Sequence, residues 1–272
     1  MIKSTRLLNK LKLNNSLICF IPILVFLPLI YQLINNFHIG GIDLFIDFST
    51  SALNPEINKE IIYISIIRLK ETFFISFISW VISILLGTIL GIFSSNIFYK
   101  FIKIPIFIKI LLKFFLNIIR SLHETIWCLI LMQIFGMSKS IGIIAICIPF
   151  TAINAKVISE QLEIINAKTI RAIIHLGGDN FSSLLTLIWG PILKILKNFG
   201  LYRFECALRS TAILGLFGIG GIGTSIFLSY QSLNFKEMWT YFWSLAILII
   251  ISKKIINKII IKKFNPKIFL IL

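Results

Sequence analysis

Charged residues are scarce in this sequence: only 14% of the 272 residues are Asp, Glu, Lys or Arg, whereas 57% are hydrophobic. A soluble domain contains about 25% charged and about 45–50% apolar residues. The chain therefore has too few polar groups to cover a folded surface of this size, which excludes most classes of soluble protein. A lipid bilayer is the natural surrounding for such a chain.

Acidic residues are scarcer still, with 11 against 27 Lys and Arg, so the formal net charge is +16. Nucleic-acid-binding proteins also have a basic excess, but they carry it on water-exposed faces. Membrane proteins instead concentrate Lys and Arg in their cytoplasmic loops. The placement of the basic residues along the chain therefore decides between these two classes.

Patterns typical of catalysis and metal binding are also missing. The sequence has no H-E-x-x-H, no G-x-S-x-G and no paired-carboxylate motif, and it has no G-x-x-x-x-G-K loop for the phosphates of ATP. His123 and Glu124 are a neighbouring base and acid, which is a weak indication of catalysis. We expect neither an enzyme nor a metal site, and no cofactor in this chain. The cysteines lie singly within apolar runs, without metal-ligand or redox spacing: Cys19, Cys128, Cys147 and Cys206.

Apolar runs predict an all-α bundle with about six membrane-spanning helices. A helix needs about 20 apolar residues to cross about 30 Å of hydrocarbon. The first run contains 18 uncharged residues, more than the about 7–15 of a secretory signal core, so we predict a retained anchor. A turn at 136–140, with a serine to cap the next helix, joins two antiparallel spans. The predicted spans are 17–34, 72–98, 125–138 preceded by 106–119, 140–155, 191–217, and 238–252 with its continuation to 260.

The basic residues assign an orientation to these spans. If the N-terminus is cytoplasmic, twenty Lys and Arg fall on the inner side and five on the outer side, while two lie within the fifth span. This bias predicts cytoplasmic N- and C-termini and argues against nucleic-acid binding. We therefore divide the chain into an N-terminal cytoplasmic segment, anchor helix and external loop over 1–71, a membrane core over 72–260, and a basic cytoplasmic tail over 261–272.

Two charged clusters lie inside or beside the spans. A charged side chain at a helix centre costs about 2.5–3.5 kcal/mol on insertion scales, so such residues usually face a bundle interior or an aqueous cavity. Arg120 and Glu124 are spaced to pair on one helix face, as are Glu205 and Arg209. Arg203 has no partner on its own face and is the better candidate to meet an anion. These five residues are candidates for a translocation path, with internally neutralised structural pairs as the alternative.

Two further segments carry functional signals. Five glycines within nine residues predict a close-packed bend or a cavity lining near the outer face, because broken backbone is not tolerated in contact with lipid. The segment 159–178 predicts a short amphipathic cytoplasmic helix that docks on a partner or on the membrane surface. The glycines are Gly215, Gly218, Gly220, Gly221 and Gly223, and the apolar stripe of the amphipathic helix is Ile170, Ile173 and Ile174.

These motifs resemble those of the permease subunits of binding-protein-dependent ABC importers, and of the phosphonate permeases in particular. The amphipathic helix is similar to their coupling helix, with Ala172 at the position of the usual Glu, or Arg171 if the register shifts by one, and with Gly-Pro in place of Leu-Pro. The matching residues are Arg120-Ser121-Leu122-His123-Glu124-Thr125-Ile126-Trp127, Tyr202-Arg203-Phe204-Glu205, Arg209, Leu214-Gly215-Leu216 and Gly220-Gly221-Ile222-Gly223, and in the coupling helix Ile170, Arg171, Ala172, Ile173, Ile174, Gly177, Gly178 and Pro191.

The resemblance implies a type I ABC importer permease of the methionine-importer architecture in the bacterial inner membrane. It implies a homodimer, separate cytoplasmic ATPase subunits that bind ATP and Mg, and a periplasmic or lipid-anchored substrate-binding protein. The implied solute is phosphonate, phosphite or phosphate. Two alternatives stay open: an ABC permease for another solute such as methionine, and a stand-alone secondary transporter, which inverted repeats would favour.

Overall fold

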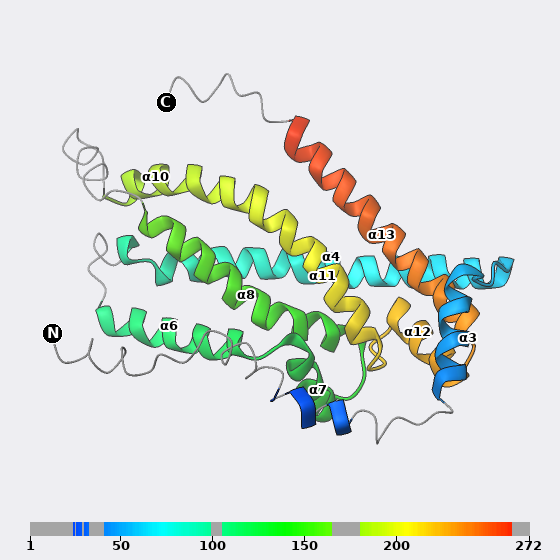
Figure 1. The fold of residues 1–272 in the computed structure, drawn as a ribbon. Coiled ribbons are helices and arrows are strands. Elements are labelled where there is room, and N and C mark those ends of the chain that lie inside the picture. The colour runs from blue at the N-terminus through cyan, green and yellow to red at the C-terminus, as the bar shows by residue number, and fades with distance from the viewer. Residues whose placement is uncertain are drawn as a thin grey trace, which may run out of the picture. The chain divides into compact units, whose positions relative to one another are not determined.

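The computed structural model describes residues 41–98, 105–164 and 180–262, and in addition residues 24, 26–28 and 30–32. Regular structure in these residues is helical throughout (Figure 1). The elements are α3 (Gly41–Leu53), α4 (Lys59–Ser94), α6 (Ile106–Ser121), α7 (Glu124–Phe135), α8 (Lys139–Glu163), α10 (Asn180–Ile195), the π-helical segment η1 (Leu196–Gly200), α11 (Leu201–Gly215), α12 (Ile222–Gln231) and α13 (Phe235–Lys262).

The chain divides into two compact units, Met1–Leu53 and Asn54–Leu272. The first unit contains α3, and the helices from α4 onward form the second. Of the anchor predicted over 17–34, only residues 24, 26–28 and 30–32 are described, and these are helical. The site is built entirely from the second unit.

Within the described residues, three helices are long and apolar enough to cross a bilayer: α4, α8 and α13 up to Ile255. They correspond to the predicted second, fourth and sixth spans. With 36 residues, α4 is about 54 Å long at 1.5 Å per residue, well beyond the thickness of the hydrocarbon core. It begins thirteen residues before the predicted second span, so part of the segment expected as an external loop belongs to this helix.

The predicted third and fifth spans differ from a single regular helix. The third is two helices, α6 and α7, separated at Leu122 and His123, which both have extended backbone conformations. The fifth begins at Asn180 instead of Pro191 and runs through η1 into α11. Pro191 lies inside α10, so the prediction that it begins the span is wrong. A proline within a membrane helix is tolerated where neighbouring groups satisfy the freed carbonyl.

The contact between α4 and α8 is made by small residues. A Cβ added to Gly87 would lie 2.5 Å from Cβ of Asn154, and one added to Gly91 would lie 2.8 Å from Cβ of Ile158. Close backbone approach through small residues is typical of membrane helices, whose packing cannot rely on the hydrophobic effect. The buried small residues of α4 are Ser65, Thr72, Ser76, Ser79, Ser83, Gly87, Gly91 and Ser94.

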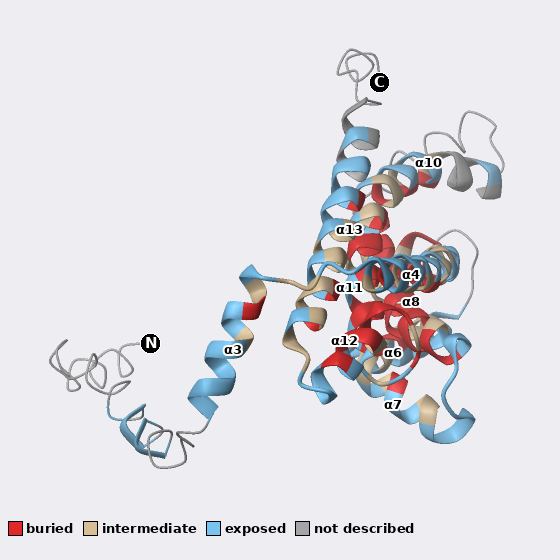
Figure 2. Ribbon diagram, turned by 90° about the vertical axis from the view of Figure 1, so that its right-hand side faces the viewer, coloured by how far each residue is buried: buried red, intermediate tan, exposed pale blue. Residues whose placement is uncertain are grey.

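Large apolar side chains occupy the outside of the same helix. Phe74, Leu85 and Ile89 of α4 are each more than half exposed. Figure 2 shows the buried residues gathered where α4, α8 and α12 meet, with exposed surface on the outer helices. Small and polar residues inside with large apolar residues outside is the arrangement expected when the surrounding solvent is lipid.

The two ends of the bundle have different compositions. At one end, Glu71 of α4, Lys139 at the start of α8 and the glycine bend before α12 lie in contact. At the other end, the residues that follow α4 and the C-terminal part of α8 pack with α10 in an apolar cluster that includes Phe98, Leu162 and Ile192. The helices α4 and α8, which are the predicted second and fourth spans, therefore run in the same direction, as expected if one span of opposite direction lies between them.

Candidate functional site

The charged segment of α11 is held in place by aromatic packing. Phe204 makes edge-to-face contacts with Phe73, Phe77 and Trp80 of α4, with ring centroids 5.4–6.3 Å apart. The indole Nε1 of Trp80 donates to the carbonyl of Gly200 at 2.6 Å, at the end of η1. These contacts fix one face of α11 against α4, so its other faces point toward α7, α8 and the outside.

Arg203 lies on the face of α11 that meets α8. It is only 9% exposed, and its guanidinium carbon lies 4.0 Å from the centroid of the Phe150 ring and 5.8 Å from that of Phe199. Its Nε and Nη2 have no hydrogen-bond partner in the described part of the chain. Arg203 is thus a buried cation that contacts aromatic rings and retains unused donors, as predicted for a side chain without a same-face partner.

Glu205 and Arg209 form the ion pair that their spacing predicts, through Oε1 and Nη2. The two side chains differ sharply in exposure, because that of Glu205 is 9% exposed and that of Arg209 is 54% exposed. The pair therefore runs from the interior of the bundle to its surface. A carboxylate in this position depends on Arg209 for its charge partner.

The predicted ion pair between Arg120 and Glu124 does not form, so that prediction is wrong. The helix breaks between them, Arg120 Nε donates to Asn117 at 3.1 Å, and no ion pair joins these two described residues. Glu124 instead accepts a hydrogen bond of 2.5 Å from Ser210 of α11. His123 caps α7 by accepting from the Thr125 amide, and its Nε2 lies 3.5 Å from Glu124. Glu124 thus joins the α11 cluster, while Arg120 lines a separate cavity between α6 and α8.

The glycine run is the close-packed bend that the sequence predicts. Gly218, Gly220 and Gly221 have φ values of 90°, 110° and 80°, a region that side chains disfavour. A Cβ on Gly223 would lie 2.0 Å from the Ala212 carbonyl oxygen. The backbone of α12 therefore begins directly against the last turn of α11. A Cβ on Gly215 would likewise lie 2.8 Å from the Cα atom of Gly223.

The N-terminus of α12 is anchored by α4, which the sequence analysis missed. The amide of Gly221 donates to Glu71 at 3.2 Å and that of Ile222 donates to the Thr72 hydroxyl at 2.8 Å. Glu71 also pairs with Arg68 at 3.1 Å and with Lys139 at 2.8 Å. One carboxylate thus connects α4, α8 and the glycine bend. The only local signal for it is an acidic residue at the edge of an apolar run.

A buried amide near α11 was also missed. Asn154 of α8 is 3% exposed, and neither its Nδ2 nor its Oδ1 has a hydrogen-bond partner within the described residues. It borders a small cavity of about 10 Å³ shared with Phe199 and Gly200 of η1. A π-helical segment often marks a functional site. An asparagine inside a predicted span was the available signal, because polar groups in a membrane segment are costly.

Most of the predicted coupling helix cannot be compared with the structure. Residues Ile170, Arg171, Ala172, Ile173, Ile174, Gly177 and Gly178 lie outside the described residues. The beginning of the segment, up to Glu163, is the end of α8, and Pro191 lies in α10. Among the described residues, no group of three or more His, Cys, Asp and Glu side chains is placed to hold a metal ion.

Comparison with curated proteins places the chain beside phosphorus-compound permeases. It is 27% identical over 118 residues to a phosphate-import permease protein of Mycolicibacterium smegmatis, covering 43% of this chain and 22% of the relative. It is 26% identical over 114 residues to a cryptic phosphonate transport permease protein of Escherichia coli K12, covering 42% of this chain and 90% of the relative. It is 24% identical over 123 residues to a phosphite transport permease protein of Stutzerimonas stutzeri, covering 45% of each.

The chain thus spans 22% of the length of the first of these relatives and 45% of the length of the third. No family model matches it. Among solved structures, it is similar to a chain of the MetNI methionine ABC transporter in an inward-facing conformation, with a TM-score of 0.67 and 16% identity over 77% of this chain and 100% of that one. It is also similar to a chain of an amino acid ABC transporter structure, with a TM-score of 0.56 and 19% identity. That similarity covers 71% of this chain and 91% of the other one. These likenesses show the fold.

Proposed function

We propose that this protein, whose curated relatives are permeases of phosphonate, phosphite and phosphate transport systems, is the transmembrane permease subunit of an ATP-driven, binding-protein-dependent importer. Its solute is a phosphonate or a related phosphorus oxyanion. Two copies form the path across the bacterial inner membrane, in a multi-pass arrangement with cytoplasmic termini. Partner ATPase subunits bind ATP and Mg and dock on the coupling helix, and a periplasmic or lipid-anchored protein delivers the solute.

The observation that carries the proposal is the state of Arg203. Its guanidinium is buried and held over Phe150, yet two of its nitrogens have no partner in the described chain. A buried polar group without a partner costs about 1–3 kcal/mol, so it persists where it has a use. Arginine binds oxyanions through parallel N–H donors, and an anionic solute passing α11 would supply the missing acceptors.

The neighbouring charges fit a path that transiently binds an anion. Glu205 is paired with Arg209, and Glu124 is hydrogen bonded to Ser210, so both carboxylates have partners and leave Arg203 as the available cation. The glycines Gly215, Gly218, Gly220, Gly221 and Gly223 bring the start of α12 against α11. We propose that this bend is a rigid gate element at the outer end of the path, moved together with α11.

The test is uptake of a radiolabelled phosphonate by proteoliposomes that contain the full complex, comparing wild type with Arg203→Gln and Arg203→Lys. We expect Arg203→Gln to reduce uptake at least tenfold and Arg203→Lys to retain part of it, because lysine keeps the charge but loses the paired donors. Lys197→Gln, which removes a positive charge within η1, is the control. Wild-type uptake by Arg203→Gln would overturn the role of Arg203.

Methionine is the second candidate solute, because the MetNI methionine transporter has the same fold. A zwitterionic amino acid has no net charge and would make weaker use of an unpaired buried cation. The same proteoliposomes with the complete set of partners distinguish the two. Uptake of radiolabelled methionine, with no uptake of radiolabelled phosphonate, would favour the methionine candidate.

A further inference from the structure

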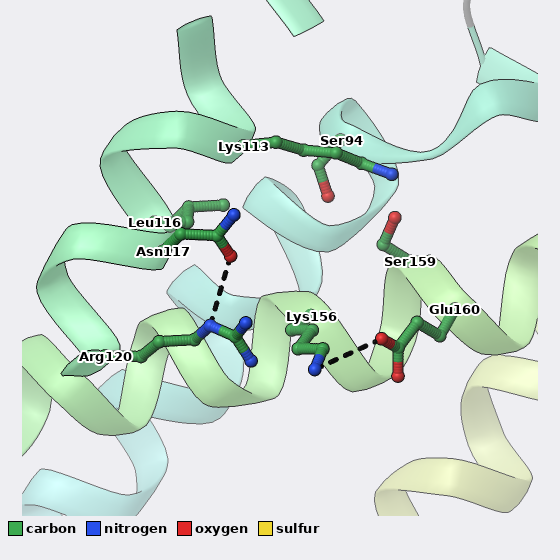
Figure 3. Close-up of a pocket in the computed structure, with 8 residues that line it drawn as sticks. All are labelled: Ser94, Lys113, Leu116, Asn117, Arg120, Lys156, Ser159 and Glu160. Atoms are coloured by element: carbon green, nitrogen blue, oxygen red, sulfur yellow. Dashed lines mark hydrogen bonds and ion pairs between the residues drawn. The ribbon is translucent and has the colours of Figure 1, made fainter. Parts of the chain in front are cut away.

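A second polar cavity lies between α6, α8 and the C-terminal end of α4, and its volume is about 230 Å³. Figure 3 shows Lys113 and Arg120 reaching into it from α6, and Lys156, Ser159 and Glu160 from α8. Leu116 of α6 forms a buried apolar part of the wall. The cavity is at the end of the bundle that the basic residues assign to the cytoplasm.

Two groups that line the cavity have unused hydrogen-bonding capacity. Ser159 is 3% exposed, and its hydroxyl has no partner in the described part of the chain. Arg120 uses its Nε to donate to Asn117 at 3.1 Å, and no carboxylate of the described residues lies within ion-pair distance of it. A buried hydroxyl without a partner is costly, and both groups border the same space.

The other charges around the cavity cancel. Lys113 pairs with Glu163 at 2.9 Å, and Lys156 pairs with Glu160 at 3.4 Å. The cavity therefore has one net positive charge, that of Arg120. A tetrahedral oxyanion with one negative charge would balance it and could accept hydrogen bonds from the guanidinium and from a hydroxyl.

We propose that this cavity binds a monoanionic phosphate group, with Arg120 and Ser159 as its principal donors. Two sources share this chemistry: the headgroup of an anionic phospholipid, and a small free phosphate or phosphonate. The surroundings suit the lipid, because Phe114, Phe115 and Ile118 on α6 are exposed apolar side chains and basic pockets between membrane helices bind lipid headgroups. The site is separate from Arg203 and does not depend on which solute is transported.

The experiment has two arms and uses the full chain in nanodiscs. In the first, native mass spectrometry counts phosphatidylglycerol molecules retained from a mixture with phosphatidylcholine. In the second, inorganic phosphate is titrated calorimetrically into protein in phosphatidylcholine alone. We expect Arg120→Gln to weaken binding by about ten- to hundredfold, and Ser159→Ala by about two- to tenfold. Lys109→Gln removes the same charge from the same helix outside the cavity and should bind like wild type.

Each outcome bears on the proposal. Selective retention of phosphatidylglycerol that Arg120→Gln abolishes supports the site and identifies the lipid as its source. Phosphate binding that depends on Arg120 in phosphatidylcholine discs supports the site with a free anion. Binding in neither arm, or binding equal in wild type, Arg120→Gln and Ser159→Ala, overturns it.

Two further variants separate this site from effects on folding and on transport. Ser159→Ala changes no charge and alters the side-chain volume only slightly, so its binding remains informative if Arg120→Gln fails to fold. Arg203→Met should retain binding even when uptake is lost. A loss of binding on Arg203→Met would show that the two sites are not separate.

Discussion

Replacement of Arg203 by methionine should stabilise the protein while removing its transport activity. Methionine has a similar length and no charge. The loss of two unpartnered buried nitrogens removes a cost of about 1–3 kcal/mol for each. The contact with Phe150 at 4.0 Å is lost, and such cation–π contacts contribute about 0.5–2 kcal/mol. Subtracting the lost contact from the relieved cost predicts that the unfolding free energy of Arg203→Met is higher than that of wild type by about 0–5 kcal/mol.

A stabilisation in the middle or upper part of this range is large enough to measure by thermal unfolding. In a domain of about 150–250 residues, 1 kcal/mol changes Tm by about 2–4 °C. We expect Arg203→Met to raise Tm by several degrees in detergent or nanodiscs, and phosphonate uptake by the reconstituted complex to fall at least tenfold. A buried cation that is kept although its removal stabilises the fold is one retained for function.

Arg209→Met is the matched comparison, six residues away on the same helix, and it should have the opposite effect on stability. It leaves Glu205, with a side chain 9% exposed, without its charge partner, and an unpaired buried carboxylate costs about 1–3 kcal/mol or more. We expect a lower Tm. A fall in Tm for Arg203→Met, or a rise for Arg209→Met, would refute this account of the two charges.

Two packing contacts allow further predictions. Gly223→Ala places a methyl 2.0 Å from the carbonyl oxygen of Ala212 and should lower the unfolding free energy by about 1–3 kcal/mol. The control Gly190→Ala, which has no atom within 4 Å of its Cβ, should not lower it. Equal melting curves for the two variants would contradict the close packing. Glu71→Gln weakens the ion pair with Lys139 and the hydrogen bond that anchors α12, and should lower the unfolding free energy by about 1–2 kcal/mol. In a double-mutant cycle with Lys139→Gln, additive losses of unfolding free energy would show that Glu71 and Lys139 do not interact.

The membrane character and the cluster on α11 could be predicted from sequence because they depend on local properties. Charge inside an apolar run is costly wherever the chain goes, so Arg203, Glu205 and Arg209 stand out without a structure. The Glu205–Arg209 pair follows from helical spacing, which holds since α11 is continuous. The bend at the glycines follows from their conformational freedom.

The same spacing rule failed at Arg120 and Glu124 because the helix is interrupted there. The break is compensated by contacts that local patterns do not reveal. The indole of Trp127 donates to the carbonyl of Ile119 at 3.2 Å, which satisfies a group freed at the end of α6, and His123 caps α7. Helix continuity is thus decided by side chains several residues beyond the break.

The role of Glu71 could not be predicted because its partners are distant in the chain. Lys139 is 68 residues away and Gly221 is 150 residues away. The small face of α4 was predictable in principle, since its serines and glycines recur every three or four residues within the apolar run. Counting hydrophobic residues conceals this pattern, because serine and glycine then appear only as gaps.

The exposure of Arg209 bears on how the bundle is completed. Its side chain is 54% exposed on a helix of the fifth span, and Tyr202 and Ile213 of α11 are exposed as well. A charged side chain facing hydrocarbon costs about 2.5–3.5 kcal/mol or more, so lipid is a poor neighbour for this surface. Protein or water must cover it. A second copy of the chain, with an aqueous path between the two, would do both, and the proposed homodimer would then have the exposed side of Arg209 at its centre.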